Sequence, residues 1–90
     1  MSIELMNPSE GTAQALREAI LKALPEAEVL VSAGTPGHFE VKVISTAFEG
    51  KTRVKKQQLV YASIAHLMKG ENAPVHAIDR LHTLLPGEGA

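Results

Sequence analysis

The sequence contains no cysteine. Without a thiol, the chain has no disulfide, no thiol nucleophile and no thiolate ligand of its own for zinc or an iron–sulfur cluster. Small secreted domains are often held together by disulfides, so the absence favours a reducing compartment. Any metal group that needs thiolates would have to take them from a partner.

Aromatic residues are also scarce, because the chain has two phenylalanines, one tyrosine and no tryptophan. Proteins that bind single-stranded nucleic acid stack bases on several exposed aromatic side chains, so this composition weakens that class. The formal net charge of −1 provides neither a basic excess that would attract nucleic acid nor an acidic excess typical of a solvated tail.

Long hydrophobic runs and familiar catalytic motifs are missing too. No apolar segment approaches the roughly 20 residues of a membrane-spanning helix, and the first residues lack the positive stretch and apolar run of a signal peptide. We therefore expect a cytoplasmic protein without membrane contact. The sequence has no nucleophile elbow, P-loop or H-E-x-x-H motif, which predicts a binding module rather than an enzyme.

The 90 residues, 44% of them hydrophobic, fit one domain with one core. Asn7 can cap a helix that begins at Pro8, and Pro25 ends it because proline removes a donor. The structured core is expected over about 7–84, with a frayed tail over 86–90. Further elements are predicted as strands over 28–32, 38–45 and 75–83, a turn or short helical segment over 48–51, and a helix from Thr52 to about Lys69 that ends at Gly70.

The second predicted strand has one apolar face. Phe39, Val41 and Val43 alternate with polar residues, which places His38 on the opposite face near the preceding loop. The first two strands are close enough in sequence to form an antiparallel hairpin. The order of elements predicts an α+β two-layer sandwich, in which helices cover one face of a three-stranded sheet.

Three blocks of sequence resemble the BolA family: GHFEV at 37–41, FEGKTRVKKQQLVY at 48–61 and VHAI at 75–78. Their order and spacing fit the family over residues 10–83, and the chain is most similar to its branch of short bacterial proteins. The resemblance implies a fold similar to class II KH domains, in αββαβ order.

The resemblance also implies a function. Family members bind monothiol glutaredoxins and share a [2Fe–2S] cluster with them, with ligands from the glutaredoxin cysteine, glutathione and a histidine of the BolA-like partner. It identifies His76 as that histidine. We therefore expect an adaptor in iron–sulfur handling and iron homeostasis that holds no cluster when alone and is a monomer or weak homodimer. Imidazole ligation of this kind occurs in Rieske centres.

The identity of a second ligand is less direct. Many members carry a cysteine or a second histidine in the loop after the first strand, which here is Ala33–Gly37. Thr35 falls near that position, and a hydroxyl is a poor iron ligand beside imidazole or thiolate. His38 is the nearest substitute and is our second candidate ligand. The alternative is that His38 is an ordinary exposed residue of the sheet.

The other two histidines have no metal partner at suitable spacing. On a regular strand His82 would share a face with His76, but six residues of strand span about 20 Å, too far for one metal ion. His66 falls on the predicted long helix and is expected to be exposed.

A basic cluster marks the start of the second helix. Cations there oppose the helix dipole by about a few tenths of a kcal/mol, which invites a binding role towards an acidic partner surface, glutathione carboxylates or phosphates. The alternative is a solvated helix start. The candidates are Lys51, Arg53, Lys55, Lys56 and Gln57, with Gln58 able to add hydrogen bonds.

Some family members are reported to regulate transcription by binding DNA, so a DNA-binding regulator is the alternative function. Gly34-x-x-Gly37 resembles the G-x-x-G loop of KH domains, but it lies between two predicted strands rather than between helices. A KH-like fold therefore does not by itself imply nucleic-acid binding.

Overall fold

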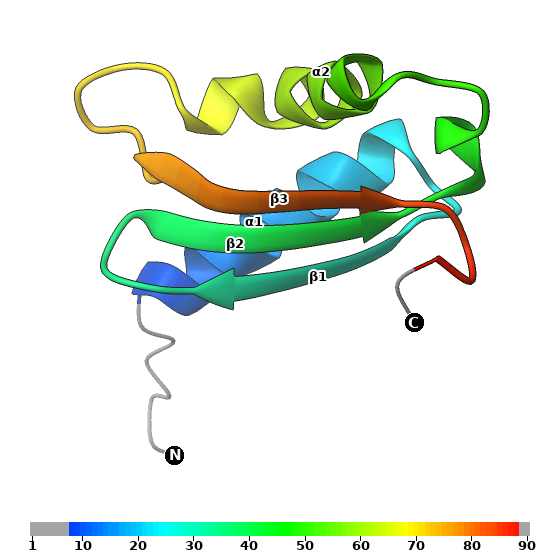
Figure 1. Ribbon diagram of the computed structural model, residues 1–90. Coiled ribbons are helices and arrows are strands. Elements are labelled where there is room, and N and C mark those ends of the chain that lie inside the picture. The colour runs from blue at the N-terminus through cyan, green and yellow to red at the C-terminus, as the bar shows by residue number, and fades with distance from the viewer. Residues whose placement is uncertain (1–7, 89–90) are drawn as a thin grey trace.

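The computed structural model describes residues 8–88. The sheet has the strand order β1-β2-β3, with β1 antiparallel and β3 parallel to β2. This is the α+β sandwich predicted from the sequence, including the antiparallel hairpin (Figure 1). The elements are α1 (Pro8–Ala23), β1 (Glu28–Ala33), β2 (His38–Ile44), the 3₁₀ turn η1 (Thr46–Phe48), α2 (Arg53–Ile64), the 3₁₀ turn η2 (Ala65–Leu67) and β3 (Ala77–Leu84).

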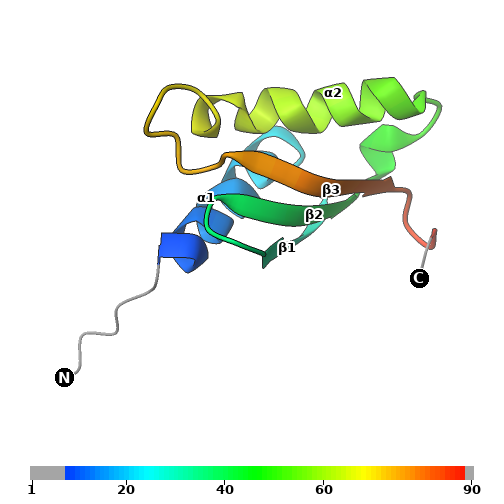
Figure 2. The same ribbon diagram turned by 60° about the vertical axis from the view of Figure 1, so that its left-hand side comes forward.

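The chain crosses from β2 to β3 through α2, and this crossover places the starts of both strands at the same end of the sheet. Figure 2 shows that end, where the loop before β2 and the segment before β3 come together. Parallel strands need such a crossover because a tight turn can only reverse the chain.

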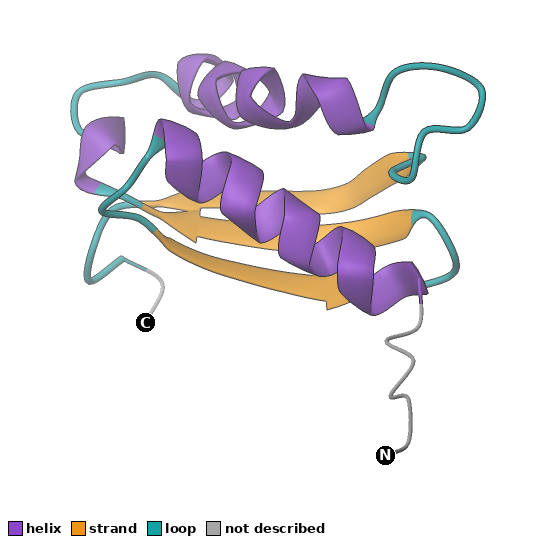
Figure 3. Cartoon of the chain, turned by 180° about the vertical axis from the view of Figure 1, so that it is seen from behind, coloured by secondary structure: helices purple, strands orange, loops and turns teal. Residues whose placement is uncertain are grey.

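The core lies between the helices and one face of the sheet. Figure 3, seen from behind, shows α1 lying across that face, with α2 beyond β3. Phe39, Val41 and Val43 point into the core as the alternation predicts, and all three are buried. Among residues 8–88, no helix covers the opposite face, which is open to solvent (Figure 1 and Figure 3). The buried cluster consists of Leu16, Ile20, Leu24, Val29, Phe39, Val41, Val43, Phe48, Val60, Ile64 and Val75.

Local signals at the helix ends are confirmed where they can be seen. α1 ends at Ala23, two residues before Pro25. The hydroxyl of Thr52 accepts a hydrogen bond of 3.2 Å from the backbone N–H of Lys55 and so caps α2. The predicted cap Asn7 lies outside the described residues. Within residues 8–88, no helix is both long enough and apolar enough to cross a membrane.

The second helix and the last strand differ from the prediction. α2 ends at Ile64 and is followed by the 3₁₀ turn η2. The prediction of a regular helix as far as Lys69 is therefore wrong for its last turn. Closing turns of helices often adopt this tighter winding. β3 begins at Ala77 rather than Val75, because the N–H of Val75 donates to the carbonyl of Leu67 and not to β2.

Residues 85–88, at the predicted tail, form a hydrogen-bonded turn. The N–H of Glu88 donates to the carbonyl of Leu85 at 2.9 Å, and the Glu88 carboxylate accepts from the N–H of Leu85 at 2.7 Å. Gly87, at a φ of 88°, allows the turn to close. Leu85 packs against the core and holds the turn in place. Residues 89 and 90 lie outside the described part of the chain.

Candidate functional site

Two histidines meet at the end of the sheet where β2 and β3 begin. His38 is the first residue of β2, and His76 immediately precedes β3. Their ring centroids lie 6.4 Å apart and the rings are inclined at 82°. The pairing of His38 with Ala77 brings them together, because parallel neighbours start side by side. The two candidate ligands therefore lie side by side.

The His76 ring occupies space that only a glycine leaves free. The carbonyl of Gly37 accepts from the N–H groups of His76 at 2.8 Å and Ala77 at 3.1 Å. A Cβ at Gly37 would lie 2.5 Å from Nδ1 of His76, and the φ of 83° disfavours other residues there. This role of Gly37 could not be predicted from the sequence, because nothing local links Gly37 to His76.

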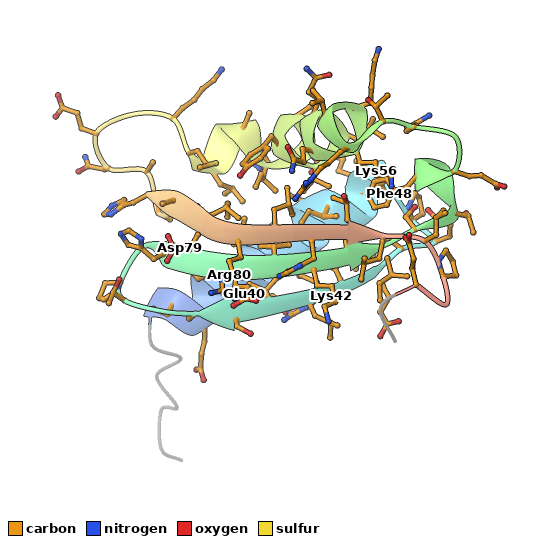
Figure 4. All side chains as sticks on the ribbon, viewed as in Figure 1. Glu40, Lys42, Phe48, Lys56, Asp79 and Arg80 are labelled. Atoms are coloured by element: carbon orange, nitrogen blue, oxygen red, sulfur yellow. The ribbon has the colours of Figure 1, made fainter. Side chains whose placement is uncertain are left out.

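β3 carries a bulge beside this site. Phe39 pairs with Ile78, but the next residue of β2, Glu40, pairs with Arg80, so Asp79 has no partner in the register. An extra residue of this kind re-aims neighbouring side chains. Figure 4 shows Asp79 and Arg80 on the open face of the sheet together with Glu40. Two consecutive polar residues, Asp79 and Arg80, stand between the apolar Ile78 and Leu81 and are the sequence signal of the bulge, but Asp79 was not among the predicted site residues.

The open face holds two pairs of histidine and carboxylate. Nδ1 of His38 lies 3.0 Å from Oδ1 of Asp79, and Nε2 of His82 lies 3.3 Å from Oε2 of Glu40. The prediction that His76 and His82 share one face of a regular strand is wrong, since His76 precedes β3 and the bulge shifts the register between them.

The histidine pair provides two imidazole ligands for a metal ion. Within the described range 8–88, no three His, Cys, Asp or Glu side chains are grouped so as to hold a metal ion. Two imidazoles on one ion have centroids about 5 Å apart, given metal–nitrogen distances of about 2.0–2.1 Å. The observed 6.4 Å is near this value, and rotation of the partly exposed His38 and the exposed His76 can close the difference. The pair fits a metal group completed by another molecule.

The remaining predicted residues of this region lie apart from the pair. Thr35 is exposed, and its carbonyl accepts from the N–H of His38 at 2.9 Å, so its contribution is to the turn. His66 is exposed on η2, as predicted, although that residue belongs to the 3₁₀ turn and not to α2.

The basic cluster is divided between two sides of α2, at the end of the sheet opposite the histidines (Figure 1). Lys51, Arg53 and Lys55 are exposed, whereas Lys56 and Gln57 are half-buried. One groove of about 470 Å³ is lined by Gly50, Lys51, Thr52, Lys55, Gln58 and Leu59. A second groove, of about 300 Å³, lies against β3 and is lined by Arg53, Lys56, Gln57, Leu81, His82, Thr83 and Leu84.

A hydrogen-bonded polar cluster, built on the buried Ser45, follows the far end of β2. The carboxylate of Glu26 accepts from Oγ of Ser45 at 2.6 Å and from the N–H and hydroxyl of Thr46 at 3.0 and 3.2 Å. These hydrogen bonds, that of Ser45 first, hold the pKa of Glu26 below its ordinary value of 4.5. Oγ of Ser45 also accepts from the N–H of Ala47 and caps η1. Sequence reasoning missed this cluster as well.

Comparisons with known proteins identify related sequences and a related fold. A family model described as BolA-like protein matches residues 12–88. An uncharacterized protein in the rpoN-murA intergenic region of Acinetobacter guillouiae is 42% identical over 64 residues, which cover 70% of this chain and 72% of that protein. The acid stress protein IbaG of Escherichia coli K12 is 33% identical over 75 residues, covering 83% and 84%. The structure of BolA1 from Arabidopsis thaliana superimposes with a TM-score of 0.72 at 27% identity, covering 96% of this chain and all of that one (100%).

Proposed function

The chain belongs to the BolA family, and on that premise we propose that it is an adaptor that binds a monothiol glutaredoxin and contributes His76 and His38 to a [2Fe–2S] cluster shared by the two proteins. The observation that carries the proposal is the convergence of these two imidazoles at an exposed point. A cysteine-free chain with two donors must obtain the remaining ligands, the thiolates, from its partner.

Each side chain has a definite task in this proposal. His76 and His38 supply neutral imidazole ligands, while the glutaredoxin cysteine and glutathione supply the thiolates. When bound, the cluster supplies one-electron chemistry and transferable iron and sulfide, and imidazole in place of thiolate raises its reduction potential. The backbone of Gly37 holds His76 at the surface, where a partner can approach. The role requires no catalytic step by this chain and no cluster when it is alone, and it suits a glutathione-rich cytoplasm.

The basic side chains have a separate task. They lie at the opposite end of the sheet from the histidines, so they do not meet glutathione that ligates the same cluster. We assign Lys51, Arg53 and Lys55 to an acidic surface of a protein partner, because all three are exposed. Opposite charges on two protein surfaces mainly speed association.

The proposal is tested by visible circular dichroism of the chain mixed with a cluster-loaded monothiol glutaredoxin and glutathione. We expect a spectrum distinct from that of the loaded glutaredoxin alone. His76→Ala should abolish the difference and His38→Ala should alter it. His82→Ala is the matched control and should behave as wild type, because His82 pairs with Glu40 away from the site. Identical spectra for wild type and His76→Ala would contradict the proposal.

The exposed cations favour a second candidate, a transcriptional regulator that binds DNA through the start of α2. The first turn of α2 carries no acidic side chain, so nothing there repels phosphate. This candidate predicts binding whose affinity falls steeply with salt, because phosphate contacts release counterions. An unchanged affinity for duplex DNA in the double variant Lys55→Glu, Lys56→Glu would rule it out.

A further inference from the structure

We infer that Asp79 is a positioning residue that holds His38 in the tautomer whose lone pair is on Nε2, so that Nε2 is the atom His38 offers to a metal group. The role of Nε2 as a ligand rests on the proposed function. The tautomer does not, because it is a property of this chain alone.

The contact determines which nitrogen carries the proton. Oδ1 of Asp79 lies 3.0 Å from Nδ1 of His38, within hydrogen-bonding distance. An ionised carboxylate only accepts hydrogen bonds, so Nδ1 has to be the donor. In a neutral imidazole with its proton on Nδ1, the free lone pair is on Nε2. Histidines that bind metals are commonly oriented in this way by a carboxylate on the other ring nitrogen.

The bulge in β3 places Asp79 where it can act. Ile78 and Leu81 both pack against the core, while the two residues between them, Asp79 and Arg80, are both exposed. A regular strand has one outward residue between two inward ones. The bulge therefore adds one side chain to the open face, and that side chain contacts His38. Bulges are common beside functional sites, where they re-aim a side chain.

Stability alone does not account for this arrangement. The side chains of His38 and Asp79 are 38% and 56% exposed, and ion pairs so open to water contribute little to folding. What the contact does determine is which nitrogen carries the proton in a ring that lies beside His76.

The second pair on the open face is an internal reference. Glu40 approaches Nε2 of His82, at 3.3 Å, and so favours the opposite tautomer, with the lone pair on Nδ1. One rule thus predicts opposite tautomers for two histidines of the same protein. Asp79→Ala and Glu40→Ala form matched variants, since each removes one exposed carboxylate from the same face.

The first test is long-range ¹H–¹⁵N NMR of the intact chain alone, in mildly alkaline solution. We expect a pyrrole-type Nδ1 for His38 and a pyrrole-type Nε2 for His82. Asp79→Ala should move Nδ1 of His38 towards the pyridine type and leave His82 unchanged, and Glu40→Ala should do the reverse. A pyridine-type Nδ1 of His38 in wild type, or unchanged His38 shifts in Asp79→Ala, would overturn the inference.

The second test uses the cluster-loaded glutaredoxin. Loss of an orienting carboxylate typically lowers metal affinity about 10–100-fold, so Asp79→Ala should weaken the complex by that factor and Glu40→Ala should not. A changed tautomer with unchanged affinity would show that Nε2 is not the ligand and would overturn the inference. Failure of the proposed function is distinguishable, because then His76→Ala also leaves the dichroism unchanged while the tautomer result stands.

Discussion

The two ends of β2 hold polar clusters of opposite character. At the start of the strand, His38 is partly exposed and His76 is exposed, and Nδ1 of His38 contacts Asp79. After it, Ser45 is buried at 1% exposure, and its hydroxyl both donates to Glu26 and accepts from a backbone N–H. One cluster is open to another molecule and the other is complete.

This difference indicates that the histidine cluster is a binding site and that the cluster around Ser45 stabilises the fold. A buried hydroxyl has to be satisfied by the chain itself, because an unsatisfied one would destabilise the fold. Among residues 8–88, no buried side-chain nitrogen or oxygen lacks a hydrogen bond. Exposed imidazoles can be hydrated in the free protein, and a metal group can replace that water when the complex forms. The comparison thus predicts that changes at the first end affect binding and changes at the second affect stability.

The largest effect is expected from Gly37→Ala. The new Cβ would collide with the His76 ring and strain a backbone with a φ of 83°, so the ring must leave its position. Binding of the cluster-loaded glutaredoxin should fall as far as in His76→Ala, measured by visible dichroism. Gly34→Ala is the control: its Cβ would come no nearer than 3.7 Å to a neighbouring atom, so binding should be retained. Equal binding by Gly37→Ala and Gly34→Ala would show that the position of the His76 ring does not matter for binding.

A smaller effect, on stability alone, is expected from Ser45→Ala. The change removes a buried donor to Glu26 and the cap of η1. Urea unfolding should show a loss of about 0.5–1.5 kcal/mol, the net contribution of a typical hydrogen bond, because the exposed Glu26 can be solvated in the variant. The affinity for cluster-loaded glutaredoxin should be unchanged at temperatures where both proteins are folded. A variant of wild-type stability would show that the second cluster is not a support.

The smallest effect concerns the acid stability of the same cluster. The pKa of Glu26 is lowered in the folded chain, so its stabilising contribution is complete above the ordinary value of 4.5 and is lost as pH falls through the folded pKa. Urea unfolding at a series of pH values should show wild type losing more stability than Glu26→Gln below that value. If the free energy of unfolding of the two proteins depends on pH in the same way, the ionised Glu26 carboxylate does not stabilise the fold.

Much of the fold could be predicted because its signals are local. Alternation in β2 identified the buried Phe39, Val41 and Val43, and Thr52 caps α2 as its position suggested. The meeting of His38 and His76 was also predictable, since it needs only that their two strands be neighbours.

The rest depended on contacts between segments that are distant in sequence. The fit of the His76 ring against Gly37 and the approach of Asp79 to His38 both join β3 to the start of β2. The two consecutive polar residues Asp79 and Arg80 interrupt the alternation of β3 at the bulge, but the pattern does not say which side chain Asp79 contacts. For the same reason, nothing near Ser45 points to Glu26.

The most direct test of the shared-cluster proposal is pulsed electron paramagnetic resonance of the reduced complex, formed from ¹⁵N-histidine-labelled chain and unlabelled glutaredoxin. The technique detects nitrogen nuclei bound to the cluster. The account predicts couplings from two ¹⁵N ligands, of which one disappears in His76→Ala and the other in His38→Ala, while His82→Ala retains both. A complex that forms without any ¹⁵N coupling would contradict it.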